Sequence, residues 1–271
     1  MHTPIELTFA ELINDPHSGD PLHGCAVSLV DLIYLPSTGV KVGTFKKAQF
    51  GVVHKQPVGQ SVPTLNRVCI KQCIRRTSPA TSPSTSSSHQ VVVYDNIKQA
   101  ELLTTELNCM RWGKGLMGLC YNFIRVGIAL DGDPPQPIPE MSFVSISLAV
   151  GVDGPRDTFL LEDIIDPRKE GRFVKYISNN SAKPIVFQND PDKTRIAQFL
   201  SFCQHVQYIK TRNLAFVSDF QGMLSFLHFN SHETFLTQTL QVVAHCSRIP
   251  RSLPTRKSYS SSTSVLLRPC S

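Results

Sequence analysis

Four short segments of the chain carry residue types that bind or transfer phosphate groups. The first is GTFKKA at 43–48, where small residues between two predicted strands let backbone N–H groups approach phosphate oxygens. Gly43 and Lys46 are its candidate cofactor contacts. Most G-x-x-K sequences are ordinary turns, and that interpretation stays open on this segment alone.

The second segment is VCIKQCI at 68–74, with Lys71 at its centre. A lysine flanked by apolar residues either extends its ammonium group to the sheet edge or meets an anion, because a buried ammonium without a partner is costly. A phosphate and a helix glutamate would together satisfy it, as in the lysine–glutamate pair of protein kinases. Glu106 on the next predicted helix is the favoured partner and Glu101 the second, with an edge charge as the alternative.

The third and fourth segments carry acidic residues at the ends of predicted strands. TFLLE at 158–162 places Glu162 where an adenine-binding connector could begin, although any strand that leaves a core can end in this way. VSDFQG at 217–222 places Asp219 and Gln221 two residues apart in a predicted tight turn. Mg²⁺ prefers such oxygen ligands. A capped turn with a solvated aspartate is the alternative.

The pattern around these segments predicts an α+β fold. Residues 25–75 are typical of strands separated by Gly and Pro turns, and residues 142–165 are typical of a hairpin. Apolar spacing predicts one helix over 95–120, capped by Asp95. A second helix is predicted to begin at Asp190, which is followed by a proline that suits the first helical position.

The expected domain spans 25–245. We divide it into an N-lobe at about 25–165 and a C-lobe at about 166–245. An N-terminal segment, 1–24, comes before the domain, and a disordered basic Ser-rich tail, 246–271, comes after it. Residues 77–89, TSPATSPSTSSSH, are of low complexity and predict a flexible insert.

Composition limits the classes of function. The 271 residues, 41% of them hydrophobic, suit one large domain or two lobes that share a cleft. The eight cysteines form no C-x-x-C pair, and the chain has neither a secretory signal nor an apolar run of about 20 residues. We therefore expect an intracellular, cytoplasmic protein with no membrane partner. The net charge of +6 lies in short patches without interleaved aromatic residues, which makes nucleic acid an unlikely partner.

Taken in order, these segments resemble the alpha-kinases, a family of atypical Ser/Thr protein kinases, in their fungal form. The resemblance covers about 40–222. The matching stretches, in chain order, are G-x-F-K-x-A at 43–48, C-x-K-Q at 69–72, a helix with Glu106 and Trp112-Gly113, F-L-L-E at 159–162, F-x-K-Y at 173–176, F-x-Q-H at 202–205 and D-x-Q-G at 219–222.

The resemblance implies a two-lobed kinase-like fold, with a curved, mostly antiparallel N-lobe sheet with a helix and a smaller α+β C-lobe. It implies phosphoryl transfer from Mg-ATP to Ser/Thr of a protein or peptide substrate. By resemblance, Lys71 holds the ATP phosphates, Glu106 orients Lys71, and Glu162 lies at the adenine hinge. Asp219 and Gln221 hold Mg²⁺, and Asp219 and Lys71 are the catalytic residues.

The resemblance ends after residue 222. Where the family has L-T-D-P, this chain has LTQT at 236–239, and the amide of Gln238 cannot accept a proton as a carboxylate does. The family's Gly-Asn phosphate loop and closing His/Cys zinc cluster are missing, so His205, which matches a structural zinc ligand, has no four-ligand set around it.

We therefore expect an alpha-kinase that is degenerate or truncated at its C-terminus. A nucleotide-binding pseudokinase or inactive fragment is the alternative to an active kinase. A basic scaffold or nucleic-acid-binding protein is the second alternative.

Overall fold

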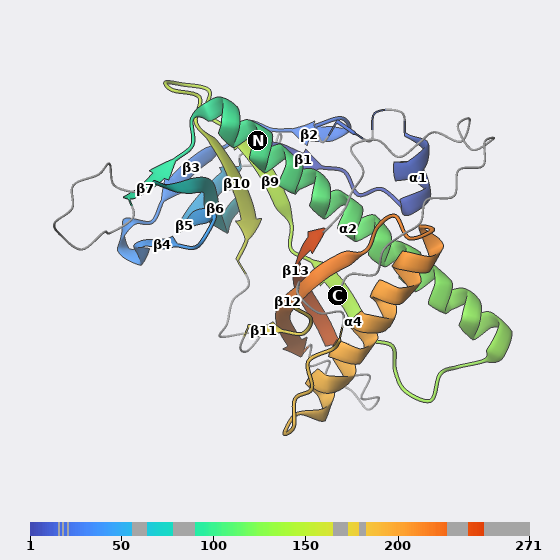
Figure 1. Cartoon of the computed structure of the whole chain (residues 1–271). Coiled ribbons are helices and arrows are strands. Elements are labelled where there is room, and N and C mark those ends of the chain that lie inside the picture. The colour runs from blue at the N-terminus through green and yellow to red at the C-terminus, as the bar shows by residue number, and fades with distance from the viewer. Residues whose placement is uncertain are drawn as a thin grey trace.

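A computed structural model of the chain describes residues 1–15, 17, 19–20, 22–55, 64–77, 90–164, 173–178, 183–226 and 238–246. Two β-sheets and a small number of helices make up these residues (Figure 1), which confirms the predicted α+β class. The predicted flexible insert lies outside the described residues except for Thr77, and the predicted tail lies outside them after Cys246.

The larger sheet has nine strands and is curled and antiparallel throughout, in line with the predicted curved, mostly antiparallel sheet (Figure 1). Its main order is β2-β1-β9-β10-β6-β5-β3, with β4 beside β5 and β7 beside β6. The strands are β1 (His2–Pro4), β2 (Cys25–Val27), β3 (Asp31–Tyr34), β4 (Val40–Val42), β5 (Lys46–Lys55), β6 (Thr64–Thr77), β7 (Gln90–Val93), β9 (Ile146–Val150) and β10 (Thr158–Asp163). A short 3-10 helix, η1 (Pro36–Thr38), joins β3 to β4.

Residues before the predicted domain start at residue 25 contribute a strand to this sheet. Strand β1 pairs with both β2 and β9, and α1 (Phe9–Asn14) follows it with a capping box between Thr8 and Glu11. The side chain of Leu12 is fully buried against α2 at Gly115, where an added Cβ would lie 2.6 Å from a Leu12 methyl group. The glycine therefore makes room for α1.

Helix α2 (Asn96–Asp131) has 36 residues and contacts both sheets. Asp95 caps it as predicted, by accepting a hydrogen bond from the N–H of Lys98. The helix continues past the predicted end at residue 120, because the mostly apolar residues 121–130 keep helical spacing. It stops at Gly132, whose φ of 87° suits a residue without a side chain.

The smaller sheet has four strands in the order β11-β12-β13-β8, with β8 and β13 parallel. Its strands are β8 (Glu140–Phe143), β11 (Val174–Lys175), β12 (Val217–Phe226) and β13 (Gln238–Cys246). Strand β8 comes before residue 166 in the chain, and β11, β12 and β13 come after it. The weak pattern after residue 222 also hid a strand, β13, which pairs along most of its length with β12.

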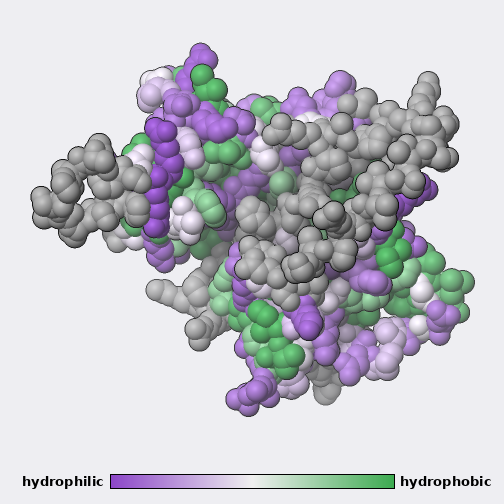
Figure 2. Space-filling model, viewed as in Figure 1, coloured by the Kyte–Doolittle hydropathy of each residue, from purple (hydrophilic) through white to green (hydrophobic). Residues whose placement is uncertain are grey.

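Helix α4 (Pro191–Lys210) begins as predicted, with Asp190 as cap and Pro191 at the first position. It packs against α2 and β12 and closes a core shared by α2, α4 and both sheets. A second, smaller cluster lies on the other side of the large sheet, around Val68, Ile70 and Leu161. Figure 2 shows apolar side chains on the surface where the end of α2 lies, and Leu130 is exposed there.

Candidate functional site

Strand β6 places Lys71 on the face of the large sheet that α2 covers. Residues two apart share a face of a strand, so Cys69 and Cys73 lie beside Lys71. On the neighbouring strands, Glu162 of β10 stands opposite Cys69, and Lys46 of β5 stands opposite Cys73. Three segments singled out by sequence therefore meet on one sheet face.

Two ion pairs form on this face. Lys71 Nζ donates a hydrogen bond to Glu162 Oε2, and Lys46 Nζ donates one to Glu106 Oε1 on α2. The Glu162 side chain is only 7% exposed, whereas the other three are between 20% and 25% exposed. We call these four residues the charge cluster.

The predicted pairing of Lys71 with Glu106 is wrong, and the sheet register explains why. Glu162 lies on the strand next to Lys71, close to it on the same face. Helix α2 meets β6 farther along, where the side chain of Gln99 hydrogen-bonds both the N–H and the carbonyl of Cys73. Two turns later, α2 presents Glu106 to Lys46, the residue opposite Cys73.

Lys71 remains charged in this setting. Burial alone would lower the pKa of its ammonium group, but the charge of Glu162 and its hydrogen bond outweigh burial and raise the pKa. Glu106 adds to the same effect more weakly. Burial also raises the pKa of the Cys69 thiol, against the opposing effect of Lys71, so the thiol stays protonated at neutral pH.

A third lysine gives the site a surplus of positive charge. Lys41 of β4 stands opposite Ala48, which in turn stands opposite Lys71, so all three share the face. Lys41 Nζ lies 5.8 Å from the centre of the Phe50 ring. Three lysines thus face two glutamates, a net charge of +1, and this balance favours an anion.

The turn at 43–45 joins β4 to β5 and leads directly into Lys46. The Gly43 N–H donates to the Lys46 carbonyl at 2.8 Å, and the Ile74 N–H donates to the Phe45 carbonyl at 2.9 Å. The amide of Gly43 is thus engaged within the hairpin, which counts against the predicted role of this N–H at a phosphate. Lys46 is the residue of this segment that reaches the charge cluster.

Asp219 and Gln221 lie within β12 rather than in a turn after a strand, which corrects the prediction. Strand β12 pairs with β11 and β13, and a β-bulge between Ser218 and Gln221 interrupts its register. A bulge changes the direction of side chains locally, so the bulge, rather than a turn, determines how these residues are oriented. The side chain of Asp219 lies outside the described part of the structure.

Sequence reasoning assigned no role to two glutamines that fix the start of β12, although Gln204 lies in the F-x-Q-H stretch. Gln204 Nε2 donates to the Val217 carbonyl, and the Val217 N–H donates to Gln207 Oε1, each at 2.8 Å. Gln207 is fully buried and Gln204 is 7% exposed. The signal in the sequence is a pair of amides on the apolar side of α4, where side chains need partners.

No group of three or more His, Cys, Asp or Glu residues that could hold a metal ion occurs in the part of the chain that the structure describes. His205 is exposed on α4, pointing away from the core that Gln204 enters. The magnesium site at Asp219 and Gln221 stays a prediction. Among the described helices, none is long and apolar enough to cross a membrane.

The charge cluster combines lysines from two strands with glutamates from a third strand and a helix, under one covering helix. This arrangement can hold an anion against fixed, charged donors. No protein-family model matches the chain, and no curated protein and no solved structure is significantly similar to it.

Proposed function

We propose that the chain binds Mg-ATP at the charge cluster, and that it derives from an alpha-kinase that transfers a phosphoryl group to Ser/Thr of a protein substrate. The observation that carries the proposal is the pairing of Lys46, on a strand, with Glu106, on the helix that covers it. In protein kinases a strand lysine paired with a helix glutamate holds the nucleotide phosphates. A two-lobed kinase-like arrangement of the two sheets belongs to the same proposal.

The lysines would act as donors to phosphate oxygens. Lys71 and Lys46 each pair with a glutamate, and each ammonium group has two further N–H donors for a ligand. Glu162 and Glu106 hold these ammonium groups in place and do not themselves contact phosphate. Lys41 supplies the surplus charge that attracts the anion.

Asp219 and Gln221 are the residues that would hold Mg²⁺, which neutralises phosphate charge when it is bound. An oxygen pair at a bulge suits a hard cation. Helix α2 supports their place in the site, because a Cβ at Gly113 would lie 3.8 Å from Val217, the first residue of β12. Gly113 follows Glu106 by seven residues, about 10 Å along the helix, so the bulge and the charge cluster flank one stretch of α2.

One position favours binding without transfer. The family's catalytic stretch would place an aspartate where this chain has Gln238, and Gln238 is the first residue of β13, opposite Phe226. A strand position and a neutral amide both argue against a proton acceptor there. A nucleotide-binding pseudokinase is therefore the second candidate.

Thermal unfolding with and without Mg-ATP tests the binding. We expect Mg-ATP to raise the Tm of the unmodified chain, and the shift to disappear in Lys71→Ala and in Lys46→Ala. Lys47→Ala is the matched control, because Lys47 neighbours Lys46 but points to the opposite face, where it lines an open groove. An unmodified chain without any Tm shift, or a shift kept in both cluster variants, overturns the proposal.

Phosphate transfer separates the two candidates. The unmodified chain and Lys71→Ala are incubated with labelled ATP, Mg²⁺ and a Ser/Thr peptide mixture, and the label on peptide is counted. Transfer that Lys71→Ala loses identifies a kinase. Binding without transfer identifies a pseudokinase.

A further inference from the structure

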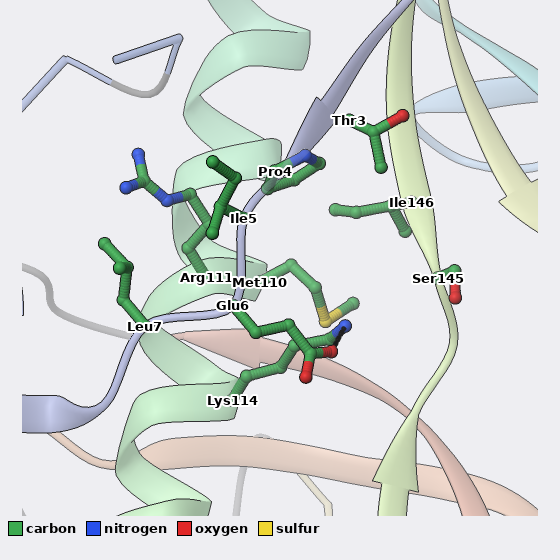
Figure 3. A pocket seen from close by; sticks show the side chains of 10 residues that line it. All are labelled: Thr3, Pro4, Ile5, Glu6, Leu7, Met110, Arg111, Lys114, Ser145 and Ile146. Atoms are coloured by element: carbon green, nitrogen blue, oxygen red, sulfur yellow. Dashed lines mark hydrogen bonds and ion pairs between the residues drawn. The ribbon is translucent and has the colours of Figure 1, made fainter. Parts of the chain in front are cut away.

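Two hollows in the molecule differ in whether their charges are already paired. A cavity of about 140 Å³ lies between α2, the segment that follows β1, and the start of β9 (Figure 3). Lys114 and Glu6 line it and satisfy each other, with Nζ and Oε1 2.7 Å apart. The second hollow is an open groove of about 390 Å³ on the large sheet, a volume in the range of small-molecule sites. Its charged side chains and amides have no hydrogen-bond or ion-pair partners among the described residues.

The sheet register places the groove on the face opposite the charge cluster. Lys47 of β5 stands opposite Gln72 of β6, and Gln49 shares the face of Lys47 because it is two residues farther along the strand. Tyr34 of β3 stands opposite Gly51, two residues beyond Gln49. The side chains of three neighbouring strands therefore line one surface of the curled sheet.

Two aromatic rings meet across the curl of this sheet. Tyr34 belongs to β3 and Phe159 to β10, and strands β5 and β6 separate them in the sheet order. Their ring centres are nevertheless only 6.2 Å apart, at an interplanar angle of 73°. Tyr34 is 43% exposed, so aromatic surface remains open to a ligand. Such surface attracts cations because the face of an aromatic ring is electron-rich.

A carboxylate stands beside these rings. Asp157 lines the groove two residues before Phe159. Burial raises the pKa of the Tyr34 hydroxyl, and the charge of Asp157 raises it further. Within the residues that the structure describes, the Asp157 side chain has no hydrogen bond or ion pair. Aromatic surface with one free carboxylate suits a methylated ammonium ion, whereas a primary ammonium ion would leave N–H donors unsatisfied against the rings.

The other polar side chains of the groove are hydrogen-bond donors. Lys47, Gln49 and Gln72 are half-buried, and their side chains bond to nothing in the described part of the chain. An ammonium group and two amides can together donate to an anionic group. Lys47 and Asp157 are the charged residues of the lining, and they are not paired with each other. Separated opposite charges favour a ligand that carries both signs.

We propose that this groove binds a small betaine, a zwitterion in which a short chain joins a methylated ammonium group to an anionic group. The methylated ammonium lies against Tyr34 and Phe159, beside Asp157. The anionic group accepts hydrogen bonds from Lys47 and the neighbouring amides, and Ile70 contributes to the floor under the chain. The site does not depend on nucleotide binding, because the charge cluster lies on the other face of the sheet.

Calorimetric titration with γ-butyrobetaine tests the proposal. One control ligand is its isostere with a quaternary carbon in place of the charged nitrogen, which keeps the shape and the carboxylate. The other is butyltrimethylammonium, which lacks the anionic group. We expect saturable binding of one γ-butyrobetaine per chain, about tenfold tighter than either control ligand, because each control loses one charged contact.

Variants assign the two ends of the ligand. Tyr34→Leu and Asp157→Asn should weaken γ-butyrobetaine binding about tenfold and leave the binding of the isostere unchanged. Lys47→Ala should weaken both ligands, because it removes the partner of their carboxylate, while it keeps the Tm shift caused by Mg-ATP. Asp31→Asn is the matched control, because Asp31 is an exposed carboxylate on the same strand as Tyr34 but on its opposite face.

Tyr34→Phe guards against a loss of folding at this position, since it keeps the ring and should keep the binding. No saturable γ-butyrobetaine binding, equal binding of the isostere, or full binding by Tyr34→Leu would each overturn the proposal. A chain without a Mg-ATP shift that still binds γ-butyrobetaine would contradict only the proposed nucleotide site.

Discussion

The two faces of strand β6 differ in what they bury. One face carries Val68 and Ile70, which are 4% and 3% exposed and pack in the small apolar cluster behind the sheet. The other face carries Lys71 between two cysteines, and α2 covers it. Antiparallel strands often alternate apolar and polar residues because one face meets water. Here the polar face is covered as well, so solvation does not account for its charges.

The contrast separates stability from function. Burying apolar surface stabilises the fold directly, whereas desolvating an ion pair costs about as much as the pair returns. The stabilisation of the fold is thus a sufficient reason for the apolar residues on this face. The charge cluster needs another reason, which the proposed ligand supplies.

The largest expected effect comes from the apolar face. Ile70→Ala should lower the free energy of unfolding by about 4 kcal/mol, because the side chain packs tightly over Gly51 and the sheet cannot close the space. Urea denaturation measures this value. The Tm shift caused by Mg-ATP should persist in the variant, and its loss would contradict the separation of the faces.

Breaking the buried ion pair on the charged face should destabilise the protein less than Ile70→Ala does. Glu162→Gln leaves the Lys71 ammonium without a counter-ion and should lower the free energy of unfolding by about 2 kcal/mol, since Lys71 keeps 20% of its side-chain exposure. The double variant Lys71→Met with Glu162→Leu should recover most of that loss while abolishing the Mg-ATP shift. A double variant as unstable as the single one would mean that the pair serves the fold.

Among the residues of β6, alkaline pH should act on those of the charged face. The pKa of Cys69 is raised from its ordinary 9.0 by burial, so its stabilising contribution is complete below pH 9 and is lost as pH rises through the folded-state pKa. Lys71, whose pKa is raised above 10.5, acts in the same direction at higher pH. Urea unfolding between pH 8 and pH 10 should show a shallower decline in Cys69→Ala than in the unmodified chain. Ile70→Val should keep the original slope, and equal slopes in all three would refute this assignment.

The smallest effect separates two glutamates on α2. Glu106→Gln should lower the free energy of unfolding by about 1 kcal/mol, because its side chain is 21% exposed and pairs with Lys46 across the interface. Glu101→Gln should cost less than about 0.5 kcal/mol, because that side chain is 59% exposed and pairs within the helix. Equal losses in thermal unfolding would place Glu106 among ordinary surface charges.

Local signals in the sequence predicted the starts of the two long helices, α2 and α4, correctly. Asp95 and Asp190 are caps whose hydrogen bonds depend only on the next three residues. The hairpin of β9 and β10 was likewise predicted, because its strands are neighbours in the chain. An acidic partner for Lys71 followed from the cost of burying an ammonium group.

Long-range pairing could not be predicted from the same signals. Which glutamate meets Lys71 depends on the β6–β10 register, and register is set by residues about ninety positions apart. Strand β13 went unnoticed because its sequence lacks clear alternation and its partners are β12 and the distant β8. The cavity at Lys114 joins three elements that share no motif, so only the folded chain brings its lining together.

The length of α2 has a consequence for how its sequence can change. Glu106 serves one sheet, while Gly113 lies against Phe143 and Val217 of the other and Gly115 admits Leu12 of α1. Inserting a single residue between Glu106 and Gly113 would turn everything after it by about 100° around the helix axis. Substitutions act at single contacts, but an insertion there would uncouple the two sheets at once, so α2 tolerates changes of residue far better than changes of length.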